Sequence, residues 1–98
     1  MSWSLVFHPD VREEVQEAYR HYEKQLFGLG DDFLEAIEEV LDRLRQTPEA
    51  HQVIHRDVRR ALPRRFPYCI YYRVHADRVE VIAIQHGRRN PKDWQSRL

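Results

Sequence analysis

The segment between Phe66 and Gln85 constrains the fold more than any other part of the chain. Alternate side chains at its start are large and apolar, as expected for a strand with one buried face: Phe66, Tyr68, Ile70, Tyr72 and Val74. The side chains between them, including Tyr71 and Arg73, are expected on an open face. Ala76-Asp77 predicts a tight turn, and Val79–Gln85 is apolar on both sides, which predicts a central strand covered on both faces.

Two amphipathic helices are predicted before these strands. The first begins after Pro9, with Asp10 expected to accept free backbone N–H groups. Its apolar stripe repeats at helical spacing, and its other face is expected in solvent with Glu13, Glu14, Glu17 and Arg20. The stripe consists of Val11, Val15, Ala18, Tyr19, Tyr22 and Leu26.

The second helix is predicted to begin at Asp31-Asp32 and to end at Thr47-Pro48. Its apolar stripe comprises Phe33, Ile37, Val40, Leu41 and Leu44. Because Phe27–Gly30 is a short turn that contains two glycines, the two helices are expected to form an antiparallel hairpin.

These elements predict one α+β domain over residues 1–98. Trp3–Phe7 is expected to form an N-terminal strand that joins the later strands in one sheet. The helical hairpin covers one face, a three-stranded antiparallel β-meander completes the sheet, and a short C-terminal helix follows in Pro91–Leu98, anchored by Trp94. The first meander strand is the weakest prediction, within Val53–Leu62.

Charge is distributed unevenly although the net charge is zero. Residues 1–50 carry 5 Lys and Arg against 12 Asp and Glu, a net charge of −7, and residues 51–98 carry 11 against 4, a net charge of +7. Such asymmetry predicts a basic surface for an acidic partner, although helices rich in Glu for their propensity are a simpler explanation. Three arginine pairs mark this surface: Arg59-Arg60, Arg64-Arg65 and Arg88-Arg89.

Several classes of protein are disfavoured by the composition. A single cysteine, Cys69, permits no intramolecular disulfide and fits a reducing compartment. The chain has no apolar run of membrane-spanning length and no signal-peptide pattern, so we expect a cytoplasmic protein with no membrane partner. His51 and His55 have no third ligand nearby, and neither a metal nor another cofactor is expected.

Three longer segments carry a family resemblance. They are G-L-G-D-D-F-L-E-A-I at Gly28–Ile37, R-R-F-P-Y-C-I-Y-Y-R-V at Arg64–Val74 and V-E-V-I-A-I-Q-H-G-R-R-N-P at Val79–Pro91. Over nearly its whole length, including the early strand and the helix ending in Y-E, the chain resembles the RelE/ParE superfamily of bacterial and archaeal type II toxins. The F-P-Y-x-I-Y-Y-R-V and H-G-R-R-x-P motifs are similar to those of the ParE-like branch, also known as plasmid-stabilisation proteins.

The resemblance implies the toxin of a type II toxin–antitoxin module, neutralised by direct binding of a cognate antitoxin. The antitoxin is expected to wrap its C-terminal segment over the helical hairpin and sheet, forming a toxin–antitoxin hetero-oligomer. ParE toxins act on DNA gyrase, so the resemblance implies growth inhibition through gyrase. Two alternatives remain: a ribosome-dependent mRNA endoribonuclease of RelE type, with the ribosome and mRNA as partners, and an inactive relative that only binds an antitoxin.

The nuclease alternative needs a proton acceptor, a proton donor and cations around a phosphate. The residues for these roles would be His86, Arg65, Arg73 and Arg89, although His86 equally suits a turn at Gly87. RelE-like nucleases carry an arginine where this chain has Cys69, and a tyrosine or histidine near the end, where this chain has Trp94. We therefore favour inhibition by binding and leave enzymatic activity open.

The residues predicted to contact the target or the antitoxin all lie in the C-terminal part of the chain, between residues 59 and 94. They comprise the three arginine pairs, two aromatic residues, one arginine within a predicted strand and one histidine directly after the last predicted strand. The full set is Arg59, Arg60, Arg64, Arg65, Tyr71, Arg73, His86, Arg88, Arg89 and Trp94.

Overall fold

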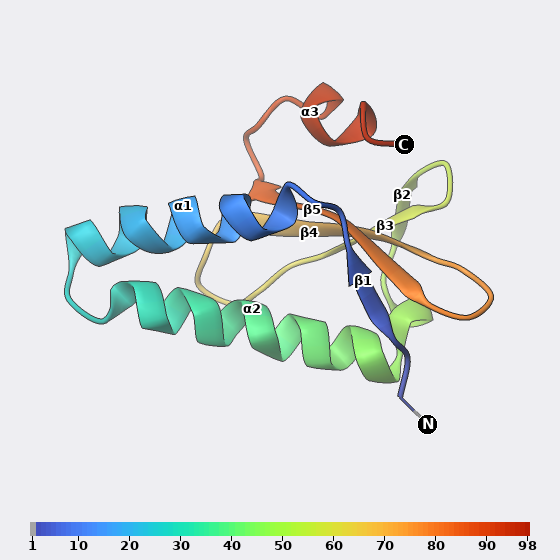
Figure 1. The fold of residues 1–98 in the computed structure, drawn as a ribbon, viewed down its shortest axis with the longest axis horizontal. Coiled ribbons are helices and arrows are strands. Elements are labelled where there is room, and N and C mark those ends of the chain that lie inside the picture. Colours follow the sequence, from blue (N-terminus) through green and yellow to red (C-terminus); the bar gives the residue numbers. More distant parts are fainter. Residues whose placement is uncertain (1) are drawn as a thin grey trace.

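The computed structural model describes residues 2–98 and shows one sheet between two helical layers, α1 and α2 on one face and α3 on the other (Figure 1). The predicted α+β class and order of elements are confirmed. In chain order the elements are β1 (Leu5–Phe7), α1 (Val11–Gln25), α2 (Leu29–Gln46), the 3-10 turn η1 (Pro48–Ala50), β2 (Val53–His55), β3 (Val58–Ala61), β4 (Tyr68–Val74), β5 (Val79–His86) and α3 (Lys92–Gln95).

The sheet has five strands in the order β1-β5-β4-β3-β2. As predicted, the N-terminal strand joins the later ones; β1 lies parallel to β5, with Leu5 opposite Val79, and the other neighbours are antiparallel. The segment predicted as one weak strand is divided into β2 and β3 by a turn at Arg56, which has a φ of 53°. The meander after the hairpin therefore has one short strand more than the sequence indicates.

Two hydrophobic cores lie on the two faces of the sheet. The larger one packs α1 and α2 against Ile70, Tyr72 and Val81, all fully buried, as the alternation predicts. The smaller one lies under α3, where the Trp94 ring stacks on Tyr71 with centroids 4.4 Å apart. The prediction of an open face at Tyr71 is wrong, because α3 leaves that residue only 6% exposed.

The turn between α1 and α2 is shaped by Gly28 and by a side chain of α1. Gly28 has a φ of 88°, which favours glycine. The Glu23 carboxylate accepts the N–H groups of Gly28 and Gly30, each at 2.9 Å, and so caps the start of α2. Consequently α2 begins at Leu29, before the predicted Asp31, and Leu26, predicted in the core stripe, is 64% exposed.

The start of α1 is not capped by Asp10 as predicted. Asp10 has helical backbone angles and its side chain makes no capping hydrogen bond. Its backbone N–H instead donates to His8 Nδ1 at 3.1 Å, and its carboxylate lies 3.8 Å from Arg97.

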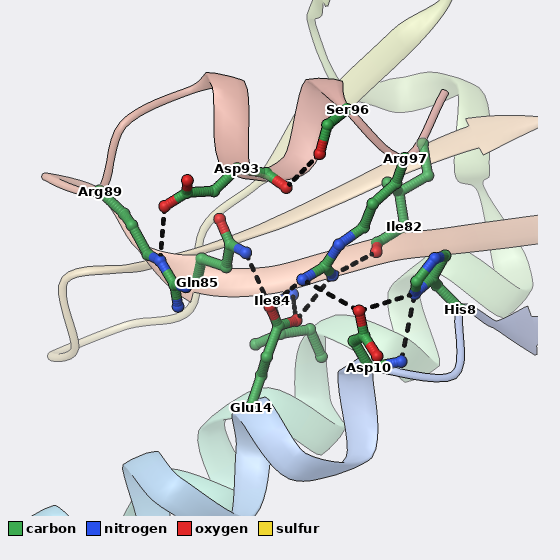
Figure 2. A network of polar contacts seen from close by, with 10 residues as sticks. All are labelled: His8, Asp10, Glu14, Ile82, Ile84, Gln85, Arg89, Asp93, Ser96 and Arg97. Carbon is green, nitrogen blue, oxygen red and sulfur yellow. Dashed lines mark hydrogen bonds and ion pairs between the residues drawn. The ribbon is translucent and has the colours of Figure 1, made fainter.

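The nearly buried pair Glu14–Arg97 joins α1, β5 and the C-terminal segment (Figure 2). Glu14 Oε1 accepts the Ile84 N–H at 3.1 Å, and Glu14 Oε2 accepts the Gln85 amide at 2.6 Å. Arg97 donates to both Glu14 oxygens, at 3.1 and 2.6 Å, and to the Ile82 carbonyl at 3.0 Å. The solvent-exposed position predicted for Glu14 is therefore wrong, since its side chain is 9% exposed.

The pair is needed because β1 is short. β1 pairs only with Val79, Glu80 and Val81, so the edge of β5 beyond Val81 has no neighbouring strand. Unpaired backbone groups at such a position cost free energy unless side chains or water satisfy them. Glu14 and Arg97 bond one N–H and one carbonyl there, and a charged pair takes the place of a strand.

We predict that Glu14→Ala lowers the free energy of unfolding by about 3 kcal/mol, because it leaves the Arg97 guanidinium and the Ile84 N–H without their partner. Urea unfolding of the variant measures the change. The matched control is Glu13→Ala, on the same helix, whose carboxylate is 60% exposed and bonds only Arg20. The control should change stability by about 0.5 kcal/mol or less, and equal losses in both variants would contradict the role given to Glu14.

Candidate functional site

The arginine pair after β3 is bound to the helical layer. Arg64 donates from Nε and Nη2 to the Glu39 carboxylate of α2, at 3.0 and 2.7 Å. Arg65 lies 3.5 Å from the Asp32 carboxylate, also on α2. Both side chains remain more than half exposed, so each ion pair is accessible to a partner.

The remaining predicted arginines contact other elements. Arg59 donates to the carbonyls of Glu49 and His51, at 2.9 and 2.6 Å. Arg89 donates from Nε to Asp93 of the α3 segment at 2.8 Å. Arg60 and Arg88 are exposed, and their side chains make no hydrogen bond or ion pair within residues 2–98. The arginines therefore do not form one group of free cations, and their role in binding stays a prediction.

Arg73 lies inside the sheet rather than at its rim. It is 3.8 Å from Asp57 and 3.9 Å from Glu80, and its buried Nε makes no hydrogen bond within the described part of the chain. The Nε2 atom of His75 also lies 2.9 Å from Glu80 Oε1. Arg73 thus belongs to a charged cluster at the end of β4 and β5 where they meet the turn.

Tyr71, Trp94 and His86 have mainly structural contacts. Tyr71 lies opposite Arg60 in the β3–β4 register and under the Trp94 ring. Burial raises the pKa of Tyr71 to about 12, as does the neighbouring Cys69, so its hydroxyl stays protonated at neutral pH. His86 Nδ1 accepts the Arg88 N–H at 3.1 Å, the turn contact that the sequence offered as the alternative to catalysis.

An apolar groove of about 850 Å³ lies between α1, α2 and the end of β1. Most of its lining residues are apolar, and the charged ones, Arg12, Glu35 and Glu38, are exposed. Phe7 and Leu34 are 45% and 38% exposed, although both are large hydrophobic residues. The lining residues that matter here are Phe7, Val11, Val15, Leu34, Ile37 and Leu41, with Arg12, Glu35 and Glu38 at the rim.

The groove continues into a free sheet edge. β1 is a terminal strand of the sheet, so its side away from β5 has no partner strand among residues 2–98. Val6, the middle residue of β1, is 41% exposed. An exposed edge strand next to an apolar groove can bind a polypeptide in two ways, by adding a strand and by accepting the apolar face of a helix.

The sequence does not indicate this groove. Leu34 lies one position away from the α2 stripe and Phe7 ends a short apolar run, so neither appears as a surface residue. Arg97 was missed for a different reason, because 83 residues separate it from Glu14. The signal for the groove that the sequence contains is Leu34, an apolar residue outside the stripe of α2.

No metal or membrane element is apparent within residues 2–98. No group of three or more His, Cys, Asp and Glu is arranged to hold a metal ion there. None of the described helices is both long and apolar enough to cross a membrane. His51 contacts Tyr72 and His55 packs against Trp94, so the two histidines have separate neighbours.

Comparison with known proteins places this chain in a defined class, the toxins of type II toxin–antitoxin systems. A family model described as "ParE toxin of type II toxin-antitoxin system, parDE" matches residues 5–91. The chain belongs to this ParE toxin family. The predicted RelE/ParE-type recognition and its ParE-like branch are thereby confirmed.

Individual relatives agree with this assignment. The chain is 27% identical over 102 residues to Toxin ParE2 of two Mycobacterium tuberculosis strains, CDC 1551 / Oshkosh and H37Rv, covering 100% of this chain and 94% of each relative. A solved structure of the chromosomal ParDE TA system from P. aeruginosa superposes with a TM-score of 0.63 at 18% identity, over 86% of this chain and 95% of the other. At that identity the second match shows a shared fold.

His51 lies in a site that disfavours its charged form. Tyr72 donates its hydroxyl proton to the Pro48 carbonyl at 2.5 Å. His51 Nδ1 lies 3.2 Å from the Tyr72 hydroxyl oxygen. Burial lowers the pKa of His51 from 6.5, and the positive charges of Arg43 and Arg59 lower it further. The folded protein therefore favours neutral His51, whereas the unfolded chain takes up a proton near pH 6.5.

We predict that this difference makes the protein less stable as the pH falls below about 6.5, where the unfolded state binds more protons. Urea midpoints of the wild type and His51→Gln, measured from pH 7.5 to 5.5, test this. Glutamine has no titrating group, so the variant should gain stability relative to the wild type as the pH falls. Two parallel profiles would show that His51 titrates alike in both states.

Proposed function

We propose that this protein is a growth-inhibiting toxin that a cognate antitoxin neutralises by binding directly to the apolar groove. The observation that carries the proposal is the groove itself, with exposed Phe7 and Leu34 at its mouth. Monomeric proteins rarely leave such side chains together in solvent without a partner. Membership of a family of toxins from toxin–antitoxin systems supports a protein partner.

The antitoxin segment that fits has two parts. An amphipathic helix would lay its apolar face between α1 and α2, and an extended stretch would pair with the free edge of β1. The rim residues Arg12, Glu35 and Glu38 offer both signs of charge to the polar side of that helix. The resulting complex is a toxin–antitoxin hetero-oligomer in the cytoplasm.

We infer further that the free toxin inhibits growth by binding DNA gyrase rather than by cutting RNA. The position at which RelE-like nucleases carry an arginine is Cys69, which is 4% exposed and uncharged. Tyr71, two residues on, is buried beneath Trp94 and remains protonated at neutral pH. The sheet face under α3 is therefore poorly suited to receive a phosphate.

The residues of the nuclease alternative also contact different partners. Arg65 lies against Asp32, Arg89 against Asp93, and His86 Nδ1 accepts a backbone N–H. Cleavage would need these groups to converge on one phosphate. Inhibition of gyrase by binding needs only an exposed surface, and the unpaired arginines Arg60 and Arg88 are its best basic candidates.

We predict that Leu34→Glu weakens antitoxin binding at least about tenfold, because it places an unpaired charge in an apolar contact. The antitoxin for this test would be the product of a short open reading frame next to the toxin gene, because the two proteins of such a pair are encoded together. Calorimetric titration of the purified toxin with it measures the change. The matched control is Leu62→Glu, the same substitution at a residue that is 56% exposed and outside the groove. Wild-type affinity in Leu34→Glu, with the fold intact, would place the antitoxin elsewhere.

We predict that the purified toxin inhibits DNA supercoiling by gyrase and that Arg60→Glu with Arg88→Glu relieves the inhibition by about tenfold in toxin concentration. Arg20→Glu with Lys24→Glu provides the same charge change on α1 outside the groove and should leave the inhibition unchanged. If mRNA from induced cells is cut at discrete codon positions and supercoiling is unaffected, the target of the toxin is the ribosome and not gyrase. Normal growth of cells that express the toxin alone would indicate an inactive antitoxin-binding relative.

A further inference from the structure

The turn between α1 and α2 places two large apolar side chains in solvent. Phe27 is 94% exposed and Leu26 is 64% exposed, and neither belongs to the two cores. Figure 1 shows this turn projecting beyond the nearest ends of β4 and β5. We call residues 26–30 the hairpin tip. Because Phe27 contributes almost nothing to the packing of the free chain, its burial by a partner is a net gain of apolar contact.

The backbone of the hairpin tip is fixed before any partner binds. The Glu23 carboxylate accepts the N–H groups of Gly28 and Gly30, each at 2.9 Å. Gly30 packs so closely against α1 that a Cβ atom there would lie 2.7 Å from the Tyr19 ring. A protein that binds the tip therefore has little backbone to order, which lowers the entropic cost of binding Phe27.

Aromatic rings hold the base of the tip in place. Tyr22 of α1 and Phe33 of α2 both pack on Phe66, in the loop before β4, with ring centroids 4.9 and 5.3 Å apart. Phe33 and Phe66 are buried, so these contacts join the ends of both helices to the larger core. Phe27 is thus an exposed ring on a rigid support, an arrangement that suits an aromatic anchor of a protein interface.

The surroundings of Phe27 are acidic. Residues 23–32 contain one lysine and three acidic residues, a net charge of −2. Arg65 lies 3.5 Å from Asp32 and offsets one charge, whereas Asp31 is exposed and raises the pKa of nearby Tyr19. Charges at the border of an interface select the partner more than they add affinity. The surface that fits the tip is therefore an apolar pocket with lysine or arginine at its border.

Two other occupants fit the tip less well. The apolar groove of a second copy carries one basic residue, Arg12, against the acidic Glu35 and Glu38, so its net negative charge repels the tip. A membrane surface that contains anionic lipids repels the tip for the same reason. A protein with a pocket bordered by basic residues has the matching charge.

We propose that Phe27 anchors the free toxin to its protein target by entering an apolar pocket bordered by lysine or arginine. The identity of that target as gyrase rests on the proposed function; the anchor does not. Arg88 lies at the same end of the molecule, because the Tyr68 ring is 6.1 Å from Tyr22 of α1 and 5.5 Å from His86, two residues before Arg88. One target can therefore contact the tip and Arg88 together.

Two substitutions of Phe27 test the anchor with gyrase. Phe27→Ala should raise the toxin concentration that half-inhibits supercoiling about tenfold or more, whereas Phe27→Trp keeps an aromatic anchor and should stay within about twofold of the wild type. The matched control is Leu62→Ala, at a residue that is 56% exposed in the loop after β3 and should act like the wild type. Urea unfolding should show unchanged stability in all three variants, because both side chains are largely in solvent.

The anchor is also tested independently of gyrase. The wild type and the variants are expressed in cells without antitoxin, and growth is followed. Phe27→Ala should relieve the growth inhibition, and Phe27→Trp and Leu62→Ala should be as toxic as the wild type. A wild type that slows growth without inhibiting supercoiling, together with relief in Phe27→Ala, would reject gyrase and still support the anchor.

Three results would overturn the anchor. If Phe27→Ala inhibits supercoiling and slows growth like the wild type, gyrase remains the target and the tip does not bind it. If calorimetric titration shows antitoxin binding at least about tenfold weaker in Phe27→Ala, the tip belongs to the antitoxin site. If the wild type binds phosphatidylglycerol vesicles and Phe27→Ala does not, the tip is a membrane contact.

Discussion

The ion pair between Glu14 and Arg97 is the contact on which the arrangement of the layers depends. It links the helix that follows β1 to the last residues of the chain, across the edge of the central strand β5. Both carboxylate oxygens are occupied by four donors, two from Arg97 and one each from Ile84 and Gln85. A nearly buried carboxylate is tolerated only when it is satisfied in this way. The pair replaces a strand that β1 is too short to supply.

Holding the C-terminal segment in place has a consequence for function. With α3 anchored, Trp94 covers Tyr71, and the second face of the sheet becomes core instead of surface. The faces of the sheet are then both occupied, while Leu34 and Phe7 in the α1–α2 groove and Val6 on β1 stay exposed. This is why the open apolar groove of the chain runs along its helices and not over a face of its sheet.

The arginines show how a cluster in sequence separates in space. Consecutive residues of a strand point to opposite faces, so Arg59 reaches the carbonyls before β2 while Arg60 stays in solvent. Arg64 and Arg65 follow the strand and reach the carboxylates of α2, whose acids lie in the other half of the chain. The opposite net charges of the two halves thus serve in part to pair α2 with the loop after β3.

The sequence by itself determined the α+β class, the helical hairpin, the two covered faces of β5 and the family, because these follow from side-chain periodicity and from motifs within short segments. It did not determine the role of Glu14, the burial of Tyr71 or the position of the groove. Periodicity places a side chain on a face of its own element, but only the packing of elements decides what covers that face. Glu14 meets Arg97 across 83 residues because the chain returns to the same sheet edge. No local pattern encodes such a meeting, and it is the tertiary structure that decides which charges are paired and which surface stays open.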